Sequence, residues 1–303
     1  MHNYQIADFN VKVMDPDELE SAVELIRQEM MNRLPAMRDV EIFNDETSYN
    51  GDQIFLLAQR FEEEVKTLDL MRTHIPTEAL VSSIDELAEK TPEYYEYPFV
   101  NGKNLLAAAT KLQPYIFVNR DLIRFHKSLR SVHKFIQESF LKTENYFDRA
   151  LEQFDNFANS KENVNLDFYK TTMNSYKAST LRTQGFYLIR SQAELDLRSE
   201  HTSKAFGSVL SAKEIQKNLL ENATFQDENH AAMVLANYAN SMKMSANSRN
   251  IETGLRYYKA ARDVLGSVQE IEEGISFYEE IQYYNDLEKE IYSFLWKQKP
   301  SMN

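Results

Sequence analysis

The stretch LIRFHKSLRSVHKFIQESF, residues 122–140, decides the fold class. Its apolar residues recur in steps of three and four, the spacing that places side chains on one face of an α-helix. These residues are Leu122, Phe125, Leu129, Val132, Ile136 and Phe140. The same steps resume further along the chain, at Phe147, Ala150, Phe154 and Phe157. The pattern predicts a single long helix from Asn119 to about Phe157.

The distribution of proline extends this prediction to most of the chain. Six of the seven prolines lie in the first 114 residues, and the seventh is Pro300. Because proline in a helix interior costs roughly 3 kcal/mol, the proline-free stretch 115–299 predicts one helix after another. After the long helix we expect helices at about 165–199, 202–221, 226–246, 250–265 and 268–297.

Short connections between these helices make neighbours antiparallel. The sequence therefore predicts an all-α protein built of antiparallel helical hairpins. We divide it into an N-terminal helical region at 1–115, a helical array at 116–297 and a tail at 298–303.

The N-terminal region begins with a short strand and a well-marked helix. FNVKV (Phe9–Val13) alternates apolar and polar residues as a strand does, and VEIF (Val40–Phe43) is its expected partner. A helix follows with Asp15 as its cap and Pro16 at its first position, where the missing N–H costs nothing. Pro35 is expected to follow the end of this helix.

Three further helices are expected in this region, at about 51–73, 77–90 and 102–112. Between the last two lies the aromatic segment TPEYYEYPF, residues 91–99, which we expect to be a loop. Two interpretations of its rings stay open: they hold the loop on the helical bundle, or they form an exposed contact patch.

Two stretches of the last third repeat one pattern. AFGSVLSA (Ala205–Ala212) and GLRYYKAA (Gly254–Ala261) each place small, larger and small residues at steps of four and three, 49 residues apart. The matching positions are Ala205, Val209 and Ala212 in one and Gly254, Tyr258 and Ala261 in the other. Each stretch follows a helix with a small residue where two helices would cross, Ala193 and Ala239.

Residues 185–266 resemble a degenerate tetratricopeptide (TPR) helical repeat on these positions. The resemblance implies a solenoid of helix pairs that binds a peptide or protein in a concave groove. The 49-residue spacing exceeds the family's 34, and Gly266 stands where the family has a closing proline. A generic α-helical solenoid or an irregular bundle gives the same spacing.

The stretch LANYANSMKM, residues 235–244, supplies the candidate binding residues. At 100° per residue its helix divides into two faces. The core face holds Ala231, Leu235, Tyr238, Ala239, Met242 and Ala246. The opposite face holds Met233, Asn237, Asn240 and Met244.

The resemblance implies that this second face lines the groove, with the amides of Asn237 and Asn240 bridging the backbone of a bound peptide. In the preceding unit the matching face carries Tyr187, Arg190, Ser191 and Glu194. The alternative is an ordinary polar surface that faces solvent.

Composition excludes several classes of function. The chain has 303 residues and a net charge of −13, which argues against nucleic acid as a partner because phosphate binding needs a basic face. It has no cysteine, no basic-then-apolar leader and no apolar run of about 18 residues, so we expect a soluble, cytoplasmic protein with no membrane contact.

No enzyme or cofactor motif stands out. The seven glycines form no phosphate-binding loop, and His126 and His133, seven residues apart, have no metal-ligand spacing to a carboxylate. We therefore expect no metal and no cofactor.

The sequence favours a non-enzymatic scaffold that binds a protein or peptide, as a regulator or adaptor. The alternative is a structural subunit of a larger assembly, including a phage or virus particle. In that case self-association would bury the YYEYPF segment and the C-terminal helix, and the protein would lie inside the particle. A helical-bundle enzyme is a distant third.

Overall fold

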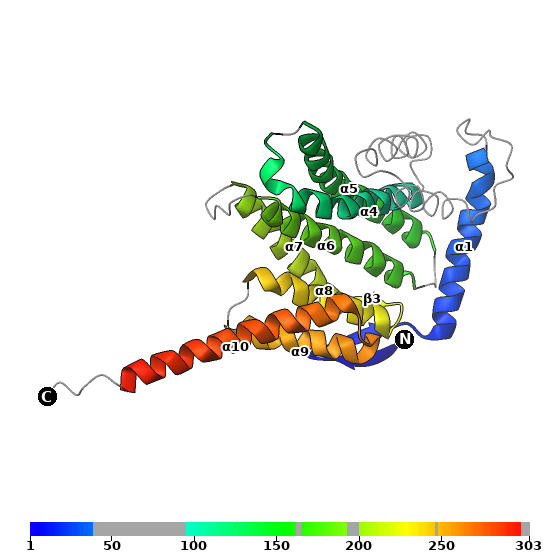
Figure 1. Cartoon of the computed structure of the whole chain (residues 1–303). Helices are drawn as coiled ribbons and strands as arrows, with labels where there is room; N and C mark the ends of the chain where they lie inside the picture. Colours follow the sequence, from blue (N-terminus) through cyan, green and yellow to red (C-terminus); the bar gives the residue numbers. More distant parts are fainter. Residues whose placement is uncertain (39–94, 126, 162–164, 193–199, 246–247, 298–303) are drawn as a thin grey trace.

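The computed structural model describes residues 1–38, 95–125, 127–161, 165–192, 200–245 and 248–297. These ranges contain eight α-helices and a sheet of three short strands (Figure 1), so the predicted all-α class with a short β element is confirmed. The helices are α1 (Pro16–Arg38), α4 (Glu96–Val118), α5 (Lys127–Asn159), α6 (Asp167–Arg190), α7 (Glu200–Asn222), α8 (Glu228–Met242), α9 (Ser248–Leu265) and α10 (Gln269–Lys297).

Each helix from α4 onward packs against the next one along the chain. In addition, α4 contacts α6 and α6 contacts α8, so alternate helices are also neighbours. At the α6–α7 crossing, a Cβ added to Gly185 would lie 2.7 Å from the carbonyl oxygen of Ala205 and would overlap Val209. Small residues therefore let these two helices approach closely at Gly185 and Ala205.

The long helix begins later than predicted. α4 ends at Val118, a short 3-10 turn covers Arg120–Leu122, and α5 starts at Lys127. The break forms at Asn119, whose side-chain Nδ2 donates a hydrogen bond of 2.8 Å to the carbonyl oxygen of Tyr115. This local bond competes with continuation of the helix.

The prediction that Leu122 and Phe125 belong to the core stripe is therefore wrong. They precede α5, and their side chains are 45% and 77% exposed. The remaining members of the stripe are buried: Leu129, Val132, Ile136, Phe140, Phe147, Ala150, Phe154 and Phe157.

The aromatic segment near residue 95 begins a helix, so the loop prediction is wrong for its described part. Tyr95, Tyr97 and Phe99 are buried, and Tyr95 packs edge-on against Phe154 with ring centroids 4.9 Å apart. Pro98 lies in the first turn of α4, where its missing N–H has no partner within the helix. These three rings belong to the core of the chain and form no exposed patch.

The strands are β1 (His2–Ile6), β2 (Phe9–Val13) and β3 (Thr224–Phe225). The predicted strand Phe9–Val13 is confirmed and lies in the middle of the sheet. It pairs antiparallel with β1, Ile6 opposite Phe9, and parallel with β3, Val13 opposite Phe225. Val40–Phe43, the predicted partner, lies outside the described residues.

The sheet shares a hydrophobic core with the C-terminal helices. Ile6, Phe9, Val11 and Val13 pack in one cluster with buried residues of α7, α8, α9 and α10. The first and last parts of the chain are thus packed together, and the division at residue 115 stays a prediction. The helices predicted at 51–73 and 77–90 lie outside the described residues.

The start of the first helix follows its prediction. The carboxylate of Asp15 accepts a hydrogen bond of 3.1 Å from the backbone N–H of Asp17, as a helix cap does. At its other end the helix continues past Pro35 to Arg38, so the predicted end is wrong.

Candidate functional site

Asn237 faces the neighbouring helix α6. Its side-chain oxygen accepts a hydrogen bond from the guanidinium of Arg182, and both residues are partly buried. The oxygen of the Asn237 amide is thus already hydrogen-bonded within the protein. The other half, Nδ2, has no hydrogen-bond partner among the described residues.

The two predicted faces of α8 differ in burial. Ala231, Leu235, Tyr238, Ala239 and Met242 are all buried, whereas Met233 is 53% exposed. Asn240 and Met244 are partly buried. Ala246 lies outside the described residues. The opposite face is thus narrower than expected, since Val234 and Ser241 are also buried.

Tyr187 and Arg190, two residues expected on the preceding unit, contact helices other than α8. Tyr187 is fully buried between α5 and α6, and its hydroxyl lies 2.6 Å from Nδ1 of His133. Arg190 is exposed, with its guanidinium 4.9 Å from the ring centroid of Phe117 on α4. Ser191 is buried, and Glu194, like Ala193, lies outside the described residues.

A second cation joins Arg182 where α6, α8 and α10 come together. Lys243, directly after α8, places its ammonium 5.1 Å from the ring centroid of Phe277 on α10 and 5.4 Å from that of Tyr258 on α9. Among the described residues, neither Arg182 nor Lys243 forms an ion pair, although the charge of Glu270 acts on both. We call Arg182, Asn237 and Lys243 the cation cluster.

The cation cluster holds its charges at an energetic cost. Burial lowers the pKa of Lys243, and the charge of Arg182 lowers it further, while Glu270 and Glu273 oppose the shift. Burial also lowers the pKa of Arg182, against the influence of Glu270. A bound anion would offset both the cost of burying these two charges and the repulsion between them. The cluster therefore favours binding of an anion.

A buried hydroxyl lies beside these cations. The Tyr258 hydroxyl has no hydrogen-bond partner among the described residues, although the residue is 1% exposed. Burial raises its pKa, so it remains a hydrogen-bond donor at neutral pH. It adds one more donor to the surroundings of the cluster.

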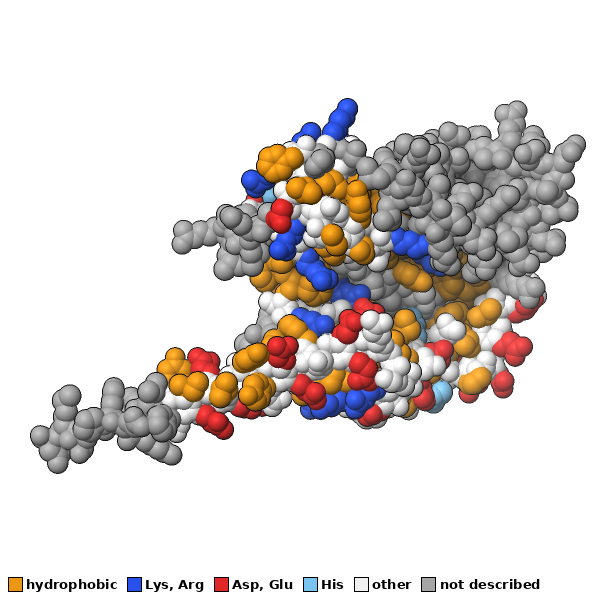
Figure 2. Space-filling model, viewed as in Figure 1, with side chains coloured by type: hydrophobic (Ala, Val, Ile, Leu, Met, Phe, Trp, Pro, Cys, Tyr) orange, Lys and Arg blue, Asp and Glu red, His pale blue; other side chains and the backbone are white. Residues whose placement is uncertain are grey.

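The surface around these helices is concave. Figure 2 shows a hollow between the part of the molecule formed by α4–α7 and the part formed by α8–α10, with basic, acidic and hydrophobic side chains at its margins. The protein as a whole carries a net charge of −13. The cation cluster thus gathers two basic groups within an acidic protein, with Glu270 and Glu273 close enough to act on Lys243.

Sequence reasoning missed both cations of the cluster. Arg182, Phe186 and Arg190 follow one another in steps of four on α6, and this spacing was the available signal. Lys243 has no comparable signal, because its position depends on rings from α9 and α10.

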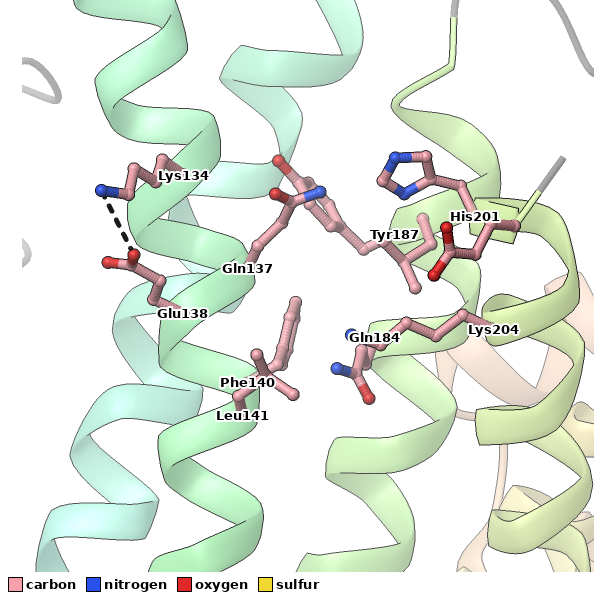
Figure 3. A pocket seen from close by; sticks show the side chains of 11 residues that line it. Lys134, Gln137, Glu138, Phe140, Leu141, Gln184, Tyr187, His201 and Lys204 are labelled. Carbon is pink, nitrogen blue, oxygen red and sulfur yellow. Dashed lines mark ion pairs between the residues drawn. The ribbon is translucent and has the colours of Figure 1, made fainter.

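A separate pocket of about 370 Å³ lies between α5, α6 and α7 (Figure 3). Its polar wall includes an ion pair between Lys134 and Glu138, 3.4 Å apart, and His201 on α7. Tyr187 and Phe140 contribute its apolar wall. Among the described residues that line it there is no Ser, Thr or Cys.

Tyr187 of this pocket forms a hydrogen-bonded pair with His133. Burial raises the pKa of Tyr187, which makes its hydroxyl a poorer nucleophile at neutral pH. Burial lowers the pKa of the adjacent His133, and the charge of His201 lowers it further. The arrangement favours a neutral, hydrogen-bonded Tyr–His pair that joins α5 to α6.

Within the described residues, no three His, Cys, Asp or Glu side chains lie close enough together to hold a metal ion. His126, the predicted neighbour of His133, lies outside these residues. None of the helices in the described ranges is long and apolar enough to cross a membrane.

Comparisons with known proteins leave the TPR resemblance as a prediction. No family model matches the chain, and no match is found among curated proteins or among solved structures.

Proposed function

We propose that this chain is a non-enzymatic binding protein whose concave face holds an acidic segment of a partner protein or peptide. The observation that carries the proposal is the cation cluster: two partly buried cations, Arg182 and Lys243, with no ion-pair partner among the described residues. An anionic side chain would gain charge-assisted hydrogen bonds there.

The other side chains of the face predicted for residues 233–244 favour a peptide over a small inorganic anion. Met233 and Met244 provide flexible apolar contacts for side chains of variable shape. The amides of Asn237 and Asn240 provide donors and acceptors for a peptide backbone. A regulator or adaptor in the cytoplasm remains the proposed setting.

Titration of a fluorescently labelled acidic peptide with the purified chain, followed by anisotropy, tests the proposal. We expect Arg182→Gln to weaken binding by about tenfold or more, because a charge-assisted hydrogen bond is worth roughly 1.5–3 kcal/mol. Lys217→Gln, on the exposed surface of α7, is the matched control and should leave affinity unchanged. Equal affinity of all three proteins would contradict the proposal.

Salt provides a second readout on the same proteins. Binding of the acidic peptide should weaken as ionic strength rises, and the Arg182→Gln protein should show a smaller dependence on salt. Binding that does not respond to salt would place the peptide away from the cation cluster.

A structural subunit of a larger assembly remains the second candidate. The observation that favours it is the exposed apolar surface of α10, where Tyr283, Tyr284 and Ile291 are each at least half exposed.

A further inference from the structure

The last helix is buried only along its first half. Ile271, Ile275 and Tyr278 are 5% exposed or less. Beyond them α10 projects away from the other helices (Figure 1). The large apolar residues on the projecting half are exposed: Tyr283, Tyr284, Leu287, Ile291 and Tyr292.

These apolar residues form one broad face. Tyr284, Leu287 and Ile291 follow steps of three and four, and Tyr283 and Tyr292 lie at the two edges of this stripe, so the face covers about half of the helix. Residues 283–292 also contain three acidic residues, Asp286, Glu288 and Glu290, against Lys289, which is ion-paired with Asp286. The projecting half of α10 is thus an acidic helix with an unpartnered apolar face.

We propose that the projecting half of α10 binds in the concave face of a second copy of this chain. This inference rests on the function proposed above, because it names the acidic segment that the cation cluster receives. Charge complementarity carries it: the acidic helix would meet Arg182 and Lys243, and its rings would meet Met233 and Met244.

The length of the helix suits this contact. Residues 283–297 form 15 helical residues, about 22 Å at roughly 1.5 Å per residue. Because packed helices lie roughly 8–10 Å apart, this length is enough to cross α6, α8 and α10 of the receiving copy.

The two surfaces differ, so the association is head-to-tail. Each copy offers one helix and one concave face, and both remain available at the ends of a dimer. Such contacts generate a closed ring or an open chain of copies, whereas a symmetric contact between two α10 helices would stop at a dimer.

Mixing two complementary variants of the whole chain tests this arrangement by light scattering after size exclusion. The groove variant carries Arg182→Gln and Lys243→Met, and the helix variant carries Tyr284→Ser, Leu287→Ser and Ile291→Ser. Each alone should be monomeric where the wild type associates beyond a dimer or forms a ring. An equimolar mixture should form a dimer and nothing larger, since only one intact helix and one intact face remain.

Leu210→Ser is the control for loss of exposed apolar surface, because Leu210 is 50% exposed on α7, and it should associate like the wild type. Circular dichroism checks that each variant is folded. Association of the groove variant with itself would overturn the proposal in favour of a symmetric α10 contact. A mixture that stays monomeric would also overturn it.

The helix variant separates this inference from the proposed function. Its concave face is intact, so it should still bind a labelled acidic peptide. A monomeric wild type together with peptide binding by the helix variant would overturn the self-association and leave the proposed function standing. Loss of both would overturn both.

Discussion

At the scale of single residues, two glycine–tyrosine pairs fix the contact between α9 and α10. A Cβ added to Gly254 would overlap the ring of Tyr278, and one added to Gly274 would overlap the ring of Tyr258. Each helix thus supplies one glycine and, four residues later, one tyrosine, which is possible only for antiparallel neighbours. The Tyr278 hydroxyl also donates a hydrogen bond of 2.7 Å to the carbonyl oxygen of Ala239 on α8.

Gly254→Ala and Gly274→Ala should each lower the free energy of unfolding by about 1–3 kcal/mol, because an added methyl group forces buried tyrosines out of place. Denaturant unfolding measures the change. Gly207→Ala is the control: no atom lies within 4 Å of its Cβ position on α7, so it should raise stability by about 0.5–1 kcal/mol. A similar gain at all three positions would show that the α9–α10 contact is looser than described.

We expect the charge of Lys243 to lower the stability of the fold while it strengthens binding of an acidic peptide. Its pKa is lowered by burial and by Arg182, so the folded protein bears the cost of its charge at neutral pH. This cost disappears as the pH rises through the folded pKa towards the ordinary value of 10.5. Lys243→Met should therefore raise the Tm at pH 7, with a smaller gain near the ordinary pKa, while it weakens binding of an acidic peptide.

Methionine suits this comparison because its thioether keeps a favourable contact with the rings of Tyr258 and Phe277. Thermal unfolding at several pH values gives the result. A lower Tm of the Lys243→Met protein at pH 7 would mean that Lys243 stabilises the fold. The presence of this lysine would then be explained without a bound anion.

At the scale of elements, the spacing of apolar residues predicted that the helices exist, but it placed their ends less accurately. The spacing of Leu122 and Phe125 continues that of α5, yet the chain turns at Asn119 because its side chain binds the carbonyl of Tyr115. A local hydrogen bond of this kind does not alter the hydrophobic pattern. The period alone therefore could not place the break.

The sheet and the site were harder to predict because both depend on contacts between distant segments. β3 follows α7 and is two residues long, and it pairs with β2 more than 200 residues earlier in the chain. Likewise Tyr187 was assigned to the groove by matching helices, but α6 has neighbours on two sides and turns Tyr187 towards α5. The core face of α8 was predictable because its apolar residues form one clear stripe.

The α5–α6 contact should make the protein sensitive to acid. Burial lowers the folded-state pKa of His133, so the unfolded chain binds a proton more readily. Stability is then constant above the ordinary pKa of 6.5 and is lost as the pH falls from there through the folded pKa. His133→Gln, which can still bond the Tyr187 hydroxyl, should reduce this loss.

Denaturant unfolding between pH 8 and pH 5 measures the dependence. Lys134→Gln, an exposed neighbour on α5, is the control and should keep the dependence of the wild type. Burial also lowers the pKa of His230 on α8, against the charge of Asp227, so some loss should persist in the His133 variant. An unchanged dependence in that variant would show that His133 titrates alike in both states.

At the scale of the whole molecule, charge separates the two proposed binding surfaces. The cation cluster lies beside the buried first half of α10, where Lys243 contacts the ring of Phe277, and the exposed half of α10 beyond it carries the acidic and apolar residues. The sequence showed the acidic composition of the last helix. It did not show that this helix leaves the array, because its apolar spacing continues without interruption beyond Tyr278.

The central claim is that the concave face recognises negative charge through Arg182. The most direct measurement is the affinity of the helix variant for two labelled peptides of equal length, one with glutamates and one with glutamines in their place. Each is measured with and without Arg182→Gln. We predict that the acidic peptide binds about tenfold more tightly or better, and that Arg182→Gln removes this preference. The same preference in both proteins, or none in either, would contradict the account.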